Sequence, residues 1–312
     1  MLKTQWILTC VPLYTILGLI LGASISAGIF VFHVAVVPLI FKYSKTFRRS
    51  LIFANFVQWP LSIDFNDPSS SGIDGARNFY LEYQSKTNSC PVRLGIWHIL
   101  PKTTYERMKG SFEGDDDEQL NELMDEELTN SKTPVILYCH GNSNSRAAWH
   151  RIQLYKFFQQ MDFHTIAFDY RGYGDSTNLN PSEGGVVEDS LIVYDWLVTT
   201  LDKSEAKPPI YVWGHSLGIK FNICFCYHAF VSDVHLSRAT SLPVLVLHAK
   251  DDVIVPYVVG HKLYKSILES RRAGDAAVTL HAYDSKLNLG HKWICTAPDL
   301  PRVVRNFVET HR

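Results

Sequence analysis

The hydropathy of the chain changes sharply near residue 42. From Thr4 to Phe41 no Asp, Glu, Lys or Arg interrupts a long apolar run, whereas charged positions recur from there to the C-terminus. A bilayer core about 30 Å thick needs roughly 20 helical residues, so the run predicts one tilted transmembrane helix. Two alternatives stay open: a short hairpin that turns between Gly22 and Gly28, and a cleaved signal peptide that ends near Ala27.

The basic residues around this run bear on its orientation. Lys3 precedes the run, and four basic residues follow it: Lys42, Lys45, Arg48 and Arg49. Because positive charge accumulates on the cytoplasmic side, the bias places the following region there. We divide the chain into residues 1–50, an anchor with its basic flank, and residues 51–312, a region large enough for one catalytic domain.

Beyond the anchor, two short apolar runs at residues 79–83 and 94–99 predict antiparallel strands. An acidic segment over residues 112–130 follows them. Its carboxylates lack the spacing of a calcium loop, which favours a solvated surface insert.

From Pro134 onward, apolar runs of strand length alternate with longer helical stretches. The predicted strands span residues 135–139, 164–168, 210–213, 244–247 and 278–282, and the predicted helices span residues 147–160, 186–201 and 256–266. This alternation predicts βαβ units and a doubly wound, mostly parallel sheet. Functional side chains are expected at the carboxyl ends of its strands, where open α/β sheets hold their sites.

Composition and charge argue against a nucleic-acid-binding protein and against a metal or disulfide framework. The formal net charge is −1, so the chain lacks the concentrated positive charge that nucleic-acid binding needs, and we expect no nucleic-acid partner. The six cysteines show no disulfide spacing. Cys224, Cys226 and His228 stand in an apolar stretch without a second ligand pair, which favours buried packing over a metal site. We predict no cofactor and no metal.

The strongest chemical signal is the pentapeptide Gly-His-Ser-Leu-Gly at residues 214–218. It follows an apolar strand, as a nucleophile elbow does, and its glycines allow the sharp turn into the next helix. The serine hydroxyl then projects from the sheet edge near the N-terminus of that helix. The motif therefore predicts acyl transfer with Ser216 as the nucleophile.

Candidates for the other two members of a catalytic triad follow in the order of an α/β-hydrolase, which is serine, acid, histidine. Asp252 comes just after the predicted strand 244–247, and we predict it to be the acid. Its neighbour Asp251 is the alternative. Either aspartate could instead have a structural role, as the N-cap of the helix that follows. His291 lies in a loop after the last strand, and we predict it to be the base. His261 and His281 fall inside predicted elements.

The oxyanion hole of such an enzyme needs two backbone N–H groups. Leu217 follows the nucleophile and supplies the first. Asn142, after the strand that begins at Val135, is the best second donor, because Gly141 lets the backbone approach closely. A plain β-turn would use the same residues.

Together these motifs resemble a known family, the membrane-bound α/β-hydrolase domain-containing type twelve lipases. The resemblance rests on the stretches at residues 140–142, 169–176, 213–218 and 247–252, and it also covers residues 55–57 and 95–98. It implies hydrolysis of monoacylglycerols and lysophosphatidylserine by an endoplasmic-reticulum membrane enzyme whose catalytic domain faces away from the cytosol. That topology opposes the charge bias, and we give the resemblance more weight. Its triad would correspond to Ser216, Asp252 and His291, and its oxyanion hole to Asn142 and Leu217.

The interval between Ser216 and Asp252 departs from the family's pattern, because only 36 residues separate them. One helix nearly fills that interval, so the α/β-hydrolase sheet is expected to lack a strand and cap elements. Loss of a central strand exposes hydrogen-bonding groups and apolar surface. A catalytically impaired, membrane-tethered variant is therefore one alternative to a lipid-ester hydrolase, and an acyl-protein thioesterase is another.

Overall fold

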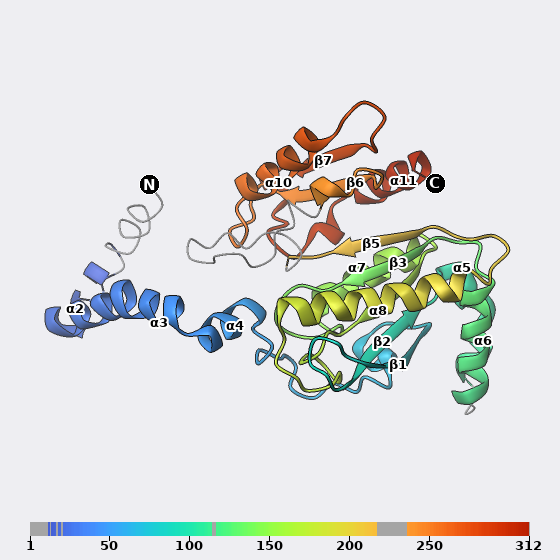
Figure 1. The fold of residues 1–312 in the computed structure, drawn as a ribbon, viewed down its shortest axis with the longest axis horizontal. Coiled ribbons are helices and arrows are strands. Elements are labelled where there is room, and N and C mark those ends of the chain that lie inside the picture. Colours follow the sequence, from blue (N-terminus) through green and yellow to red (C-terminus); the bar gives the residue numbers. More distant parts are fainter. Residues whose placement is uncertain are drawn as a thin grey trace. The chain divides into compact units, whose positions relative to one another are not determined.

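The structure is a computed structural model that describes residues 12, 14–16, 18–19, 21–113, 117–216 and 236–311. The described residues form two compact units, one up to Ala54 and one from Asn55 onward. The first unit contains the apolar N-terminal helices, and the second contains all the described strands (Figure 1).

The first unit is helical and apolar. Helix α2 (Ala23–Val31), a π-helical turn (Phe32–Val36) and α3 (Val37–Tyr43) form one segment, Ala23–Tyr43, which is long and apolar enough to cross a membrane. The sequence predicted one transmembrane helix through the whole apolar run, but the helix is interrupted before Ala23. Gly22 has φ 87°, and the ring of Tyr14 packs against Phe30 and His33, so the chain reverses at the turn of the hairpin alternative.

Helix α4 (Lys45–Phe53) follows and carries three of the four flanking basic residues. The Ser44 hydroxyl accepts a hydrogen bond from the Phe47 amide at 3.1 Å and caps the helix.

The second unit contains a mixed five-stranded sheet in the order β1-β2-β4-β3-β5. Its strands are β1 (Ala76–Gln84), β2 (Pro91–Ile99), β3 (Val135–Cys139), β4 (His164–Phe168) and β5 (Ile210–Gly214). The first two form the antiparallel start, whereas β4, β3 and β5 run parallel to one another. All residues of β4 and nearly all of β3 are buried, as expected for central strands covered on both faces.

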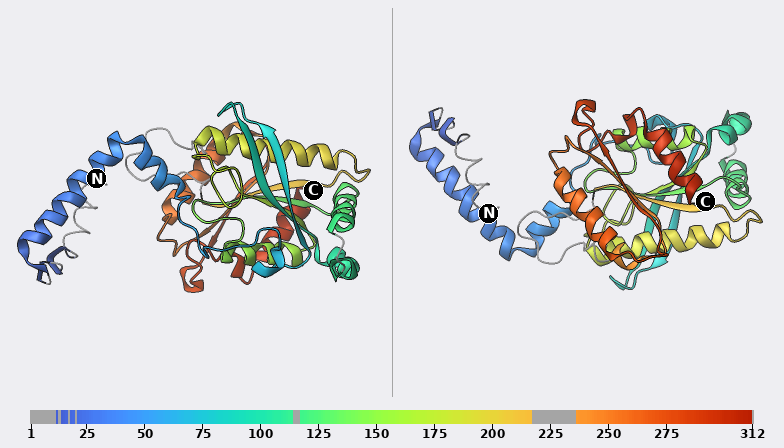
Figure 2. Two further views of the ribbon diagram at one scale, coloured as in Figure 1. Left: turned by 90° about the horizontal axis from the view of Figure 1, so that it is seen from below. Right: turned by 90° about the horizontal axis from the view of Figure 1, so that it is seen from above.

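Helices cover both faces of this sheet. Helix α7 (Trp149–Gln160) lies on one face and α8 (Glu183–Leu201) on the opposite one (Figure 2). Both match predicted helices, although α8 begins three residues earlier, because the Ser182 hydroxyl caps it by accepting the Gly185 amide. The remaining elements before β3 are α5 (Lys102–Met108), α6 (Asp117–Thr129) and short 3₁₀ turns at Pro68–Ser71 and Lys109–Glu113.

A second, two-stranded parallel sheet pairs β6 (Val244–Ala249) with β7 (Val278–Tyr283). Helices α10 (Tyr257–Ser270) and α11 (Leu300–Thr310) and 3₁₀ turns at Ser285–Leu287 and Ile294–Thr296 complete the chain. Within residues 117–216 and 236–311, no strand joins β5 to β6. The sheet of the described residues is therefore broken between β5 and β6, as the predicted loss of a strand would leave it, and Val212 of β5 is 60% exposed.

One apolar core nevertheless connects the two sheets. Tyr155 and Phe158 of α7 belong to the same buried cluster as Tyr283 of β7 and Val304 of α11. In addition, the Tyr211 hydroxyl on β5 donates a hydrogen bond to the Val308 carbonyl at 3.3 Å. Packing across helices thus replaces the strand-to-strand hydrogen bonds that the break removes.

The acidic segment is more ordered than a solvated insert. Most of its residues form α6, and Met124 and Leu128 of that helix are fully buried. Arg77 pairs with Asp125, and Arg107 donates to Glu127 at 2.6 Å. The acidic side chains face outward because the apolar ones point into a small core of their own.

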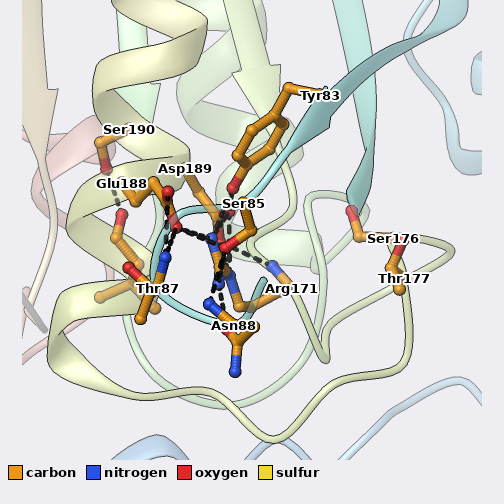
Figure 3. A network of polar contacts seen from close by, with 12 residues as sticks. Tyr83, Ser85, Thr87, Asn88, Arg171, Ser176, Thr177, Glu188, Asp189 and Ser190 are labelled. Carbon is orange, nitrogen blue, oxygen red and sulfur yellow. Dashed lines mark hydrogen bonds and ion pairs between the residues drawn. The ribbon is translucent and has the colours of Figure 1, made fainter. Parts of the chain in front are cut away.

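A buried arginine fixes the loop that follows β4 (Figure 3). Arg171 is fully buried and donates to Asp189 and Glu188 of α8, and to Tyr83 at the end of β1. Burial raises the pKa of the Glu188 carboxyl, but hydrogen bonds from Ser85 and Arg171 outweigh it and bring that pKa to about 2. The network joins the β1–β2 turn, the loop after β4 and α8 at the end of the sheet where β3, β4 and β5 terminate. The elbow after β5 lies at the same end.

Two histidines buried in the sheet predict acid sensitivity. His98 and His164 lie on neighbouring strands with Nε2 and Nδ1 3.0 Å apart, and burial lowers the pKa of His164 to about 3. The unfolded chain takes up a proton near pH 6.5 and the folded chain does not, so stability is complete above that pH and falls as pH decreases. For His164 the loss reaches about 2 kcal/mol by pH 5. Thermal melts at pH 7 and pH 5 should show a smaller shift for His164→Gln than for the wild type, and equal shifts would contradict this.

Candidate active site

The predicted nucleophile lies in a strained turn at the end of β5. Ser216 is 3% exposed and has φ 59°, a left-handed backbone that a non-glycine residue adopts in a nucleophile elbow. The preceding amide, that of His215, donates to the Cys139 carbonyl at 3.1 Å and continues the pairing of β5 with β3. The serine therefore stands where the two parallel strands end.

Three of the predicted residues form one row of hydrogen bonds. His291 Nε2 lies 2.8 Å from Ser216 Oγ, and His291 Nδ1 lies 2.8 Å from Asp252 Oδ2. With an Nδ1–H tautomer, the imidazole donates to the carboxylate and accepts from the hydroxyl. His291 and Asp252 lie in loops that follow β7 and β6, so the break in the sheet does not keep them from Ser216.

The two aspartates of the loop after β6 face different partners. Asp252 Oδ1 accepts the amides of Ile254 and Val255 at 2.9 and 2.8 Å, which fixes the carboxylate toward His291. Asp251 Oδ2 accepts the Gly290 amide at 2.8 Å, directly before the histidine. The helix N-cap reading does not apply to either, because α10 begins at Tyr257 with Pro256 as its N-cap.

His215, inside the pentapeptide, makes a second connection to the histidine loop. Its Nε2 lies 3.1 Å from the His291 carbonyl oxygen, so a neutral Nε2–H tautomer donates there. Burial lowers the pKa of His215 to about 4, which keeps the ring neutral at physiological pH. The main chain of His291 is therefore held by the elbow, while its side chain is held by Asp252.

The loop after β3 approaches the elbow closely. A Cβ on Gly141 would lie 3.0 Å from both Ser216 Cβ and the His215 carbonyl oxygen, so a side chain there would crowd the nucleophile. Asn142 is the next residue, as the sequence predicted for the second oxyanion donor. Leu217, the first predicted donor, lies outside the described residues, as do Cys224, Cys226 and His228.

A buried arginine organises this loop from behind. Arg151 of α7 is 1% exposed, and its guanidinium donates to four carbonyl oxygens, those of Gly141, Asn142, Ser143 and Ser145, at 2.6 to 3.3 Å. His140 Nδ1 also lies 2.7 Å from the Gly141 carbonyl. In a planar trans peptide the N–H points away from the C=O, so these bonds fix the direction of the Asn142 amide.

A small cavity opens beside the reacting groups. Leu247, Val255 and Ile294 give it apolar walls next to Ser216 and His291. Among the described residues, no group of three or more His, Cys, Asp or Glu side chains is placed to hold a metal ion.

Sequence reasoning did not identify Arg151 or His215 as part of the site, nor the contact that Asp251 makes with the Gly290 amide. Arg151 lies in the first turn of α7, ten residues after Gly141, and nothing in the local pattern marks it as facing a loop. His215 occupies the second position of the pentapeptide, which the G-x-S-x-G pattern leaves open to any residue type. One signal was available: an arginine on the buried side of a helix requires acceptors, and the loop carbonyls after β3 are the nearest candidates.

The comparisons with known proteins agree with the fold. A family model described as the alpha/beta hydrolase fold matches residues 134–218. An esterase structure from Pyrococcus furiosus superposes with a TM-score of 0.52 at 15% identity, over 81% of this chain and 97% of that one. With the serine at the end of β5, these findings make the chain an α/β-hydrolase.

Curated relatives define the family. Lysophosphatidylserine lipase ABHD12 of Rattus norvegicus is 30% identical over 329 aligned positions, which cover 89% of this chain and 77% of that protein. The Danio rerio protein of the same name is 30% identical over 87% of this chain and 80% of its own length, and human protein ABHD12B is 28% identical. The chain belongs to the ABHD12 family. Because 329 positions align to 89% of a 312-residue chain, the rat protein carries residues that this chain lacks.

Proposed function

We propose that this protein is a membrane-anchored serine hydrolase that cleaves the acyl ester of monoacylglycerols or lysophospholipids through an acyl-enzyme. The observation that carries the proposal is the hydrogen-bonded row from Ser216 through His291 to Asp252. The apolar segment Ala23–Tyr43 supports anchoring, and the family supports a lipid substrate.

The proposed reaction uses Ser216 as the nucleophile. His291 Nε2 takes the hydroxyl proton while Oγ attacks the acyl carbonyl carbon, and Asp252 stabilises the imidazolium that forms. The tetrahedral intermediate collapses when the ester C–O bond breaks, and the alcohol leaves with the proton from His291. A water molecule then repeats the sequence on the acyl-serine and releases the fatty acid.

The oxyanion of both intermediates would be stabilised by the amides of Asn142 and Leu217. Two contacts support the role of Asn142: the Gly141 carbonyl is held by Arg151, which turns the Asn142 amide away from it, and Gly141 lies against Ser216. The apolar walls beside Ser216 suit an acyl chain.

The proposed location is the endoplasmic-reticulum membrane, with the catalytic domain facing away from the cytosol, as the family resemblance implies. The basic residues after the apolar segment favour the opposite side. Protease protection in sealed microsomes distinguishes the two orientations.

The substrate class is tested with the purified full chain in mixed micelles. Monoacylglycerol, lysophosphatidylserine and an S-palmitoylated peptide are compared at equal acyl concentration, with fatty acid release as the measurement. We expect release from the two esters at a higher kcat/KM than from the thioester. A preference for the peptide would replace the proposal by the thioesterase alternative. A cooperative melt without turnover of any substrate would favour the impaired variant.

A further inference from the structure

Seven exposed apolar side chains flank the candidate active site. We call them the apolar rim, and they belong to two segments: Phe56, Val57, Trp59 and Leu61 in the first, and Val253, Ile254 and Val258 in the second. Their exposures run from 46% for Val57 to 86% for Val253. Apolar side chains this exposed and this close in sequence mark a surface that contacts another apolar phase.

The first segment is attached to the loop after β3. The Asn144 amide donates to the Val57 carbonyl at 2.7 Å, and the Trp59 amide donates to Asn144 Oδ1 at 3.0 Å. Asn55 Nδ2 also donates to the Gly172 carbonyl in the loop after β4. The backbone of residues 55–59 is thus fixed to the edge where the strands end, while its apolar side chains remain in contact with solvent.

The second segment begins directly after Asp252, whose carboxylate holds its first turn through the amides of Ile254 and Val255. The first segment is therefore bonded to the loop that contains Gly141, and the second continues from Asp252, the residue that holds His291. Neither carries a charge, because no Asp, Glu, Lys or Arg occurs in residues 55–63 or 253–261.

The length of chain between the apolar rim and the apolar helix limits how far the rim can lie from a membrane that the helix spans. Phe56 follows Tyr43, the last residue of the segment that is long enough to span, by 13 residues. Thirteen residues reach at most about 45 Å when extended. Helix α4 occupies nine of them and shortens the reach further. If Ala23–Tyr43 spans a bilayer, these side chains cannot leave the neighbourhood of that bilayer.

We infer that the apolar rim inserts into the interfacial layer of the membrane and places the entrance to Ser216 against the lipid surface. The inference rests on the anchoring part of the proposed function. Trp and Phe prefer the layer between headgroups and acyl chains, and an uncharged rim enters it without burying an ion. A single-chain lipid would then move from the bilayer to the serine without crossing water.

Trp59 allows a direct test with the native full chain. The protein is reconstituted into phosphatidylcholine vesicles, with or without lipid that carries a nitroxide at acyl carbon 5, and its tryptophan fluorescence is compared with that of Trp59→Phe. We expect the nitroxide to quench the fluorescence attributable to Trp59 by at least half. Acrylamide, a quencher dissolved in water, should reduce it less than in the detergent-solubilised protein.

Two relocated indoles serve as matched controls in the Trp59→Phe background. Val253→Trp places an indole in the second rim segment, and it should be quenched by the nitroxide like Trp59. Leu242→Trp places one at a side chain that is 58% exposed and lies before β6, at the opposite end of the strand from Asp252, and it should be quenched by acrylamide only.

Three results would overturn the inference. Quenching of residues 59 and 253 by acrylamide alone would place the rim in water. Protection from both quenchers would mean that protein covers it, either a second copy or the rest of this chain. Equal nitroxide quenching at residue 242 would show adsorption without a preferred face. None of these readings needs turnover, so they stay separate from a failure of the hydrolase proposal, which labelling of Ser216 reports.

Discussion

Replacing Ser216 by Ala is expected to abolish covalent labelling by a fluorophosphonate probe and to lower ester turnover by about 10⁴- to 10⁶-fold. The probe forms its bond with an activated serine oxygen, and Ser216 Oγ lies 2.8 Å from an imidazole nitrogen that can take its proton. The small turnover that remains comes from substrate binding and the oxyanion donors, which the substitution leaves in place.

A matched control uses a serine away from the site. Ser69 is exposed in a 3₁₀ turn, and its hydroxyl donates to Asp67. Ser69→Ala should be labelled and should turn over substrate like the wild type. Equal labelling of Ser216→Ala and the wild type would place the reactive nucleophile elsewhere and would remove the basis of the proposed function.

The two neighbouring aspartates after β6 are expected to differ most in how much their substitution lowers kcat. Asp252→Asn should lower kcat by about 10⁴-fold. Its Oδ1 can still accept the amides of Ile254 and Val255, so the new NH₂ group faces His291 Nδ1. That donor forces the histidine into the tautomer with a proton on Nε2, which can no longer accept the proton of the serine.

Asp251→Asn should change kcat by about tenfold or less, because the amide oxygen can still accept the Gly290 N–H and a single hydrogen bond is worth about 1 kcal/mol. Steady-state kinetics on a monoacylglycerol across pH 5 to 9 separate the two roles. Asp252→Asn should stay far below the wild type at every pH in that range. Equal losses for both variants, or a larger loss for Asp251→Asn, would assign the acid differently.

The short interval after Ser216 has a smaller effect on the site than the sequence suggested. Among the described residues, the hydrogen bonding between strands is interrupted between β5 and β6, and Val212 of β5 is 60% exposed. The site groups, however, depend on loops at the ends of β5, β6 and β7 and on the core that α7 and α11 share. A catalytic geometry built from strand ends tolerates a gap between strands if helices keep those ends together.

The parts of the fold with strong local patterns were predictable from the sequence. Strands β3, β4 and β5 and the helices between them follow from uninterrupted apolar runs separated by helical stretches, and the boundaries of β3 and β4 agree with the prediction. Helix α6 was not predicted, because its dense acidic residues conceal the two apolar positions, Met124 and Leu128, that pack inward. The reversal at Gly22 was one of three predictions for the apolar run, since glycine permits a turn without requiring one.

The sequence by itself determined the class of chemistry to look for, because a Gly-His-Ser-Leu-Gly turn after an apolar strand is a local feature set by neighbouring residues. It also determined the candidates for acid and base through their order along the chain. Only the tertiary structure decided that Asp252 rather than Asp251 faces His291, and that Arg151 and His215 hold the surrounding loops. The physical reason is that these contacts join residues 6 to 76 positions apart. Which way a side chain points across such a distance depends on how the helices and sheets pack.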